Sequence, residues 1–352
     1  MKTLTQIDQW MQSHLAPQAQ EMDEDSQALF GGFRLLGDRN LLALRLSVEQ
    51  GGQDWDARDH SQFQMLIASH SGALAFLSTQ HQSALRMLGQ SPNAALRAKL
   101  MPSLIQGQMG LGVGFSQLRR GGTPLMTASP TESGYLLTGT VPWVTGFGCF
   151  DGFICGARLP DGQILMGWVP LVRVADEPRY QVSSPLALAA MTSTQTVQIQ
   201  FSQWPMPTQD VVALHPQDWL ERKDETNLLH HGFYSLGSVR AALRLIEALL
   251  SPTNRCEMQA FGRLEQAYQN CRQTMLDLLP QQTSAPSACL RAKADAIALA
   301  GRTSQAAIAM AGGRANYRHH PAQRIYREVL AFTVFGQTAA ARDSTLAALS
   351  EI

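Results

Sequence analysis

The chain has 352 residues, of which 45% are hydrophobic and 16% are charged. This length predicts two domains or one elaborated domain, and the apolar fraction is sufficient for a packed interior. Lys plus Arg and Asp plus Glu are balanced at 28 each, so the net charge does not attract nucleic acid or anionic lipid. No basic run appears either, and we therefore expect no nucleic-acid partner.

The five cysteines are widely spaced and form no CxxC pair. This pattern predicts neither a disulfide framework nor a zinc site, and no metal is expected. The first residues alternate polar and apolar side chains and lack the apolar core of a signal peptide. No stretch approaches the roughly 20 apolar residues that span a bilayer. We expect a reduced, cytoplasmic chain without membrane insertion.

Residues 1–110 are predicted to form a helical N-terminal domain. Apolar residues recur there at helical spacing, namely Leu35, Leu36, Leu41, Leu42, Leu44, Leu46, Met65, Leu66, Ala73, Leu74, Phe76 and Leu77. Asn93 is placed to cap a helix over residues 94–105, which Gly107 would close.

Residues 111–220 have the texture of a central β domain. Short apolar runs alternate with turn residues, and residues 196–201 alternate polar and apolar side chains as a half-buried strand does. Most of the chain's 17 prolines fall between residues 121 and 220, which disfavours long helices. We expect antiparallel strands in a small barrel or sandwich.

Residues 221–352 return to helical periodicity and predict a C-terminal bundle of four-helix type. Ala-rich residues 288–311 predict a helix that a neighbouring helix can approach closely. Almost no charge lies between Asp295 and Arg302, and an exposed face of this kind on a monomer would be a large apolar patch. The sequence therefore predicts a homodimer or homotetramer.

Particular segments narrow the class of protein. Residues 134–139 followed by 142–146 match the pattern "GYxLxGxKxWITNG", and residues 312–313 followed by 321–328 match "GGxGYxxxxPxxRxxRD". Residues 107–116 stand where such chains enter their β domain. On these segments, the chain resembles the acyl-CoA dehydrogenase superfamily of flavoproteins over almost its full length. The resemblance implies a mostly helical fold with a central β domain, and a flavin between that domain and the helical bundle.

The same segments suggest where a flavin would bind. Trp143 and Thr145 lie on one face of a strand because side chains alternate, so one offers ring surface and the other a hydroxyl. The alternative interpretation is a core Trp beside an edge Thr. By resemblance, Ser116 keeps a hydroxyl near the flavin, while Gly313 and Thr338 lie near the cofactor tail, Gly313 from a neighbouring subunit. The expected cofactor is FAD, with FMN possible.

The chain departs from the family at its catalytic carboxylate. By resemblance, the two positions that carry a Glu base in this family hold Gly336 and Asn227. By resemblance, two further positions whose side chains contact FAD in the family hold Met258 and Ala309 here. Glu225 and His320 are weak candidates for a displaced base. His230 and His231 begin a predicted helix, and such pairs are more often solvated or capping groups.

Three functions remain open. The first is a flavin-dependent oxidoreductase that acts on an acyl-CoA or similar acyl substrate with hydride transfer to flavin. The second is a monooxygenase of the same fold that uses reduced flavin and O₂, and the third is a non-catalytic flavin-fold binding protein. Without a base, dehydrogenation of straight-chain acyl-CoA is expected to be absent or slow. Arg324 and Arg327 are expected to form ion pairs with residues such as Glu328.

Overall fold

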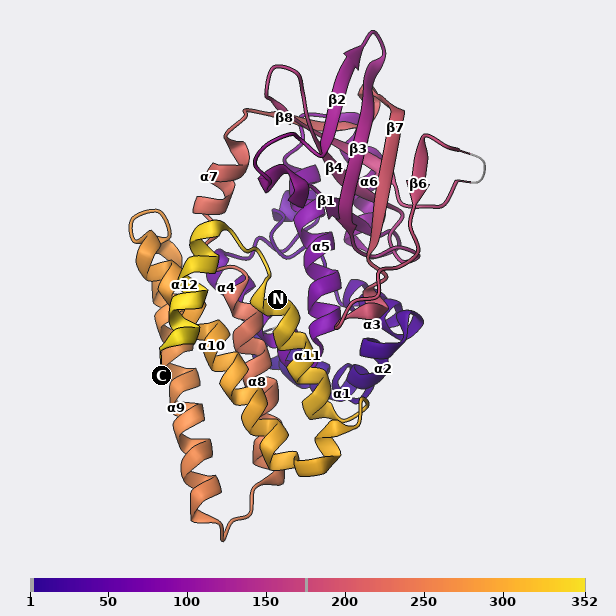
Figure 1. Ribbon diagram of the computed structural model, residues 1–352. Coiled ribbons are helices and arrows are strands. Elements are labelled where there is room, and N and C mark those ends of the chain that lie inside the picture. Colours follow the sequence, from indigo (N-terminus) through magenta and orange to yellow (C-terminus); the bar gives the residue numbers. More distant parts are fainter. Residues whose placement is uncertain (1–2, 175–176, 352) are drawn as a thin grey trace.

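The computed structural model describes residues 3–174 and 177–351. Along the chain a helical part is followed by a sheet and then by a second helical part, which confirms the predicted fold class. Figure 1 shows the strands gathered at one end of the molecule and the C-terminal helices at the other. Short helical turns up to the start of the sheet are η1 (Ala16–Gln18), η2 (Val48–Gln50) and η3 (Ser116–Arg119).

Six α-helices form the N-terminal part: α1 (Leu4–His14), α2 (Ala19–Glu24), α3 (Ser26–Asp38), α4 (Ala57–His70), α5 (Gly72–Gly89) and α6 (Ala94–Ile105). Side chains cap most of them, each accepting a hydrogen bond from a backbone N–H in the first turn; the caps are Thr3, Asp25, Asp56, Ser71 and Asn93. Each such cap is worth about 1 kcal/mol to its helix. The predicted Asn93 cap is confirmed, and it fixes the start of α6.

One predicted helical stretch is irregular instead. The helix α3 ends at Asp38, and Asn40 follows with a positive φ of 60°. Asn tolerates this left-handed conformation, which ends the helix. The leucines over residues 41–46 are nevertheless buried, so their apolar pattern reports burial in a loop rather than a helical face.

The β domain is one mixed sheet. Its strands are β1 (Leu111–Gly114), β2 (Met126–Thr131), β3 (Gly134–Val144), β4 (Gly152–Arg158), β5 (Ile164–Pro170), β6 (Tyr180–Val182), β7 (Val197–Pro207) and β8 (Val211–His215). The order is β6-β7-β3-β2-β4-β5-β8, with β1 paired to β4, and the short turns η4 (Thr192–Thr194) and η5 (Thr208–Asp210) flank β7.

The expectation of purely antiparallel pairing is wrong at β4. Both β1 and β2 pair with β4 in parallel, whereas the other pairs are antiparallel. The chain enters the sheet from α6 and leaves β1 through η3, so β1 has no hairpin partner and runs alongside β4. This arrangement places the segment after β1, including Ser116, against the helices.

The C-terminal part contains α7 (Trp219–Glu225), α8 (Gly232–Leu249), α9 (Arg255–Leu278), α10 (Pro286–Ala311), α11 (Pro321–Thr333) and α12 (Ala339–Ser350), with the turns η6 (Leu279–Gln281) and η7 (Gly312–Asn316). The Ala-rich α10 lies in the middle of this group and contacts α8, α9, α11 and α12. The expected exposed face of α10 is therefore covered by the chain itself. Exposed large apolar side chains lie instead on or next to α11 and α12: Tyr326, Leu330, Val334, Leu346 and Leu349.

Ion pairs tie α11 to the N-terminal helices. Arg324 donates to the fully buried Glu328 at 2.8 Å, which confirms the predicted pairing, and Glu328 also accepts from the backbone N–H of Gly72 at 3.0 Å. Arg327 pairs with Asp23 on α2 at 2.5 Å. These contacts fix the position of α11 and of the loop that follows it.

Within residues 3–174 and 177–351, no helix combines the length and apolar composition needed to cross a membrane. The same part of the chain brings together no group of three or more His, Cys, Asp or Glu side chains suited to hold a metal ion.

Candidate active site

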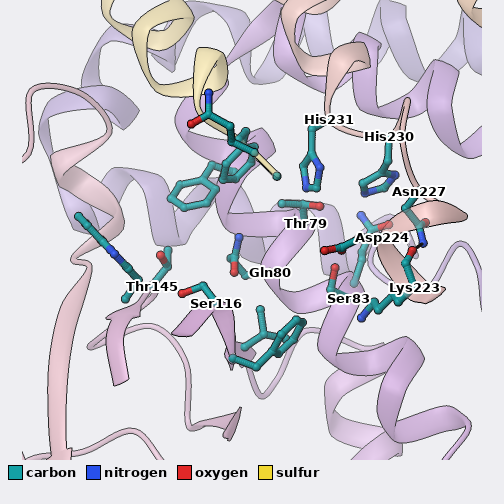
Figure 2. A pocket seen from close by; sticks show the side chains of 18 of the residues that line it. Thr79, Gln80, Ser83, Ser116, Thr145, Lys223, Asp224, Asn227, His230 and His231 are labelled. Atoms are coloured by element: carbon teal, nitrogen blue, oxygen red, sulfur yellow. Dashed lines mark hydrogen bonds between the residues drawn. The ribbon is translucent and has the colours of Figure 1, made fainter. Parts of the chain in front are cut away.

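A cavity of about 1200 Å³ lies where the sheet, the N-terminal helices and the C-terminal part meet. Its walls come from α4, α5, η3, the end of β3, α7, the start of α8 and residues 330–337. The volume exceeds the roughly 300–1,000 Å³ typical of small-molecule sites. Figure 2 shows Ser116 and Thr145 on one side, His230 and His231 across from them, and Lys223 below the histidines near Asn227.

Ser116, Trp143 and Thr145, which the sequence predicts to lie at a flavin, all line this cavity. Trp143 is 50% exposed, so it is not the core Trp of the alternative interpretation. The register of β3 against β7 shifts between Val141 and Val144, and such an irregularity re-aims a side chain. An indole face is thereby presented to the cavity instead of the core.

Thr145 is held in place by its neighbours. Its Oγ1 lies 2.9 Å from Oγ1 of Thr196, and the next residue, Gly146, donates its N–H to the carbonyl of Thr194 at 2.9 Å. Gly146 has a φ of +95°, a conformation that favours glycine. The strand end is thus fixed by η4, and the Thr145 hydroxyl keeps a defined position at the cavity wall.

Gln117 contributes an acceptor without a partner. Its Nε2 donates to the carbonyls of Gly114 at 3.1 Å and Gly156 at 2.8 Å. Its Oε1 is buried and has no hydrogen-bond partner among the described residues. Gln117 is nonetheless among the residues that line the cavity.

The two positions assigned to a Glu base by resemblance also reach the cavity. Gly336 has a φ of +56°, and a Cβ added there would lie 2.0 Å from Nδ1 of His231. The side-chain amide of Asn227 donates to the carbonyl of Lys223 at 2.6 Å, so it closes the end of α7. Neither position offers a proton acceptor of its own.

The histidines that begin α8 are the cavity groups that sequence reasoning undervalued. Nε2 of His230 accepts from the Gln64 amide at 3.0 Å, and Gln64 also donates to the Tyr234 hydroxyl at 2.7 Å. The His230 ring stacks on His60 with a centroid distance of 5.8 Å. Burial lowers the pKa of His230 and of His231 well below the ordinary value, so both are neutral at pH 7.

Cations dominate the cavity wall. Six basic side chains line it, Arg45, Arg86, Arg119, Arg120, Arg222 and Lys223, against one carboxylate, Asp224, among the described residues. Asp224 is paired with Arg119 through two hydrogen bonds of 2.7 and 2.8 Å. Burial lowers the pKa of Lys223 to about 8, and its ammonium lies over the rings of Phe115 and Trp219. The wall therefore favours an anionic ligand.

The remaining predicted site residues lie outside the cavity lining. Glu225 is exposed at the end of α7, and His320 caps α11 by accepting from the N–H of Ala322 at 3.2 Å. Thr338 caps α12 in the same way, accepting from the N–H of Ala341 at 3.2 Å. Gly313 lies in η7, at the far end of α10.

Comparison with known proteins agrees with this architecture. Residues 2–108 match the family model described as "Acyl-CoA dehydrogenase, N-terminal domain". The chain is 23% identical over 215 residues to the mitochondrial isovaleryl-CoA dehydrogenase of Pongo abelii. That match covers 59% of this chain and 51% of the relative, so it spans about half the relative's length.

Solved structures share the fold over the whole chain. The acyl-CoA dehydrogenase of Geobacillus kaustophilus aligns with a TM-score of 0.81 at 12% identity, covering 99% of this chain and 97% of that one. Butyryl-CoA dehydrogenase of Megasphaera elsdenii gives 0.77 at 16% identity and full coverage of both chains, 100% each. A glutaryl-CoA dehydrogenase of Mycobacterium smegmatis, in complex with FADH2, gives 0.81 at 14% identity, with 98% and 92% covered.

The sequence match to the acyl-CoA dehydrogenase N-terminal domain covers residues 2–108, and over its full length the chain has the fold of the solved acyl-CoA dehydrogenase structures.

Proposed function

We propose that this chain is a flavin-dependent oxidoreductase that acts on an acyl thioester, with acyl-CoA as the substrate class and FAD as the cofactor. One observation carries the proposal: Ser116, Trp143 and Thr145 converge with positions 227 and 336 on a single cavity. The similar glutaryl-CoA dehydrogenase structure that contains FADH2 supports FAD over FMN. When bound, the flavin supplies the acceptor for the substrate's hydride.

The residues present fit an isoalloxazine ring. Such a ring needs a flat surface on one face, together with hydrogen bonds along its polar edge. The half-exposed Trp143 offers the surface, while the hydroxyls of Ser116 and Thr145 can donate. The cavity wall thus combines an aromatic surface with hydroxyl groups suited to the polar edge of the ring.

The rest of the cavity fits a thioester with a phosphorylated carrier. Aromatic side chains of Phe76 and Phe335 meet edge to face at 4.7 Å and line it, which suits an acyl chain. The basic side chains listed above suit the phosphates of CoA. The acyl chain therefore has an apolar surface to contact, and the phosphates of CoA have a cationic one at the arginines.

Assembly of the site from two copies of the chain is part of the same proposal. Leu330 and Val334 line the cavity and are also exposed, at 54% and 60%. A second copy covering them would close the cavity wall and shield apolar surface from water. A homodimer or homotetramer is proposed on this surface rather than on α10.

The test is flavin titration of purified protein. FAD and FMN are added separately, and binding is followed by the flavin absorbance at about 450 nm. Trp143→Ala is expected to weaken binding by about tenfold, the size of one aromatic contact. Trp168→Ala is the matched control, because Trp168 lies outside the cavity lining. Failure of both flavins to bind would refute the proposal.

A second candidate is the monooxygenase that uses reduced flavin and O₂. The observation in its favour is that the single lining carboxylate, Asp224, is already paired with Arg119. Anaerobic mixing with an acyl-CoA panel separates the two, because only the dehydrogenase bleaches bound flavin without O₂. Hydroxylation of aromatic substrates with reduced flavin and O₂ would favour the monooxygenase, and flavin binding without either reaction would favour a binding protein.

A further inference from the structure

The space beside Gly336 is occupied by a histidine. A Cβ built on Gly336 would lie 2.0 Å from Nδ1, 2.4 Å from Cε1 and 2.8 Å from Cγ of His231. These distances are shorter than any real contact between such atoms, so the imidazole fills the volume of a side chain at position 336. The first atoms of the family's Glu would be where the His231 ring now lies.

The loop that contains Gly336 is held in place by hydrogen bonds from α10. The Lys293 ammonium on α10 donates to the carbonyls of Phe335 at 3.3 Å and Gly336 at 3.1 Å. Lys293 is only 4% exposed. The Phe335 side chain of this loop packs against His231: the two rings meet edge to face, with centroids 5.1 Å apart. The position of His231 relative to the loop is thereby determined by packing.

The hydrogen bonding of the two adjacent histidines differs. Among the described residues neither ring nitrogen of His231 has a hydrogen-bond partner, whereas Nε2 of the adjacent His230 is taken by Gln64. Both rings line the cavity. A polar group that faces a ligand cavity without a partner is available to the ligand.

We propose that His231 is the catalytic base of this chain and removes the α-proton of a bound acyl thioester. The inference depends on the proposed function, which supplies the thioester and the flavin. The α-carbon–hydrogen bond breaks, its proton goes to an imidazole nitrogen, and its electron pair forms the new double bond as the β-hydrogen leaves as hydride to the bound flavin. Acyl thioester is oxidised to the enoyl thioester and flavin is reduced by two electrons.

The groups around His231 keep its imidazole unprotonated and lower its basicity in the absence of a ligand. Burial is the main cause of its low pKa, and the cations of Lys293 on α10, Arg119 in η3 and Lys223 on α7 act in the same direction. From its own helix, His230 and Tyr234 face it as neutral groups, with Tyr234 held neutral because burial raises its pKa. An anionic thioester bound at the arginines would offset these cations and strengthen the base.

The first experiment measures proton removal apart from turnover. Flavin-loaded protein is mixed anaerobically in D₂O with the acyl-CoA that bleaches the flavin most in the panel, and deuterium at the α-carbon is followed by mass spectrometry. His231→Asn is expected to bind flavin normally and to lose exchange by about 10²–10⁴-fold, the usual contribution of a positioned base. His319→Asn is the control, because that side chain is exposed and outside the cavity lining.

The second experiment places a carboxylate base at position 336 in place of the imidazole at position 231. Gly336→Glu alone is expected to lower the unfolding midpoint of the flavin-free protein, because the new side chain meets the imidazole. His231→Gly combined with Gly336→Glu makes room for the carboxylate, so the midpoint should recover and exchange should exceed that of His231→Gly alone.

The outcomes separate the two proposals. Failure of flavin or of every thioester to bind overturns the proposed function and this inference with it. Normal binding together with exchange in His231→Asn within about tenfold of the unmodified protein overturns only the assignment of His231. A stable Gly336→Glu protein with the histidine still present would likewise refute the shared volume.

Discussion

Substituting Gly336 by Ala tests the contact with His231 directly, without any ligand. Two costs are expected. The first is backbone strain, because Ala at a φ of +56° costs about 1 kcal/mol or slightly more. The second is displacement of the imidazole, since the new Cβ would lie 2.0 Å from Nδ1, and overpacking of this kind typically costs about 1–3 kcal/mol. The sum predicts a loss of about 2–5 kcal/mol in the free energy of unfolding.

A matched glycine isolates the second cost. Gly122 also has a positive φ, +82°, but a Cβ added there has no atom within 4 Å. Gly122→Ala is therefore expected to lose only the backbone part, about 1 kcal/mol. The difference between the two variants measures the clash with His231.

The measurement is urea unfolding of the flavin-free protein, followed by circular dichroism, with both variants made in the original and in a His231→Gly background. With the imidazole removed, Gly336→Ala should cost no more than Gly122→Ala, and the cycle should give a coupling of about 1–3 kcal/mol. Equal destabilisation by the two glycine substitutions in the original background would refute the proposed contact.

Three further outcomes are expected. Lys293→Met removes the two donors to the 335–336 carbonyls and should lower the free energy of unfolding by about 1–3 kcal/mol in the same urea assay. Hydrogen bonds from His70 and the guanidinium charges of Arg240 and Arg244 outweigh burial and hold the pKa of Asp8 well below its ordinary value. The folded pKa is the lower one, so this stabilisation is present above about pH 4 and is lost as the pH falls further; Asp8→Asn should flatten that loss in melts from pH 7 to pH 3. Light scattering should return a dimer or tetramer at micromolar concentration, and Leu330→Glu should shift it toward monomer, whereas monomeric starting protein would exclude the proposed interface.

Local signals predicted most of the fold. The Asn93 cap, the alternating strand that became β7 and the Ala-rich α10 each depend on neighbouring residues, and the structure has all three. The error at Asn40 has the same origin, because a single residue with a positive φ ends a helix that the leucine spacing would continue. Helix and strand propensities are short-range properties, so they survive without knowledge of the tertiary structure.

The sequence could not predict which helices pack against α10 or which strand lies beside β1. An alanine stripe packs equally well against a helix of its own chain or of another, and in this chain α8, α9, α11 and α12 cover α10. The parallel pairing of β1 with β4 is also non-local, because nothing near β1 specifies the strand beside it. The exposed leucines of α11 and α12 then become the apolar surface that needs an explanation.

In the candidate site, too, relations between residues close in sequence could be predicted, whereas contacts between distant segments could not. Strand alternation predicts that Trp143 and Thr145 share a face; in the structure Trp143 lies in β3 and is half-exposed, whereas Thr145 follows the strand's last residue and is buried. The contact of His231 with Gly336 joins the start of α8 to the end of α11, and no local pattern connects them. Considered alone, Gly336 indicates a lost base and His231 a helix-capping residue. Considered together, the glycine is what the imidazole requires, since any side chain at 336 would meet it. A carboxylate at 336 would require the His231 ring to leave its present position.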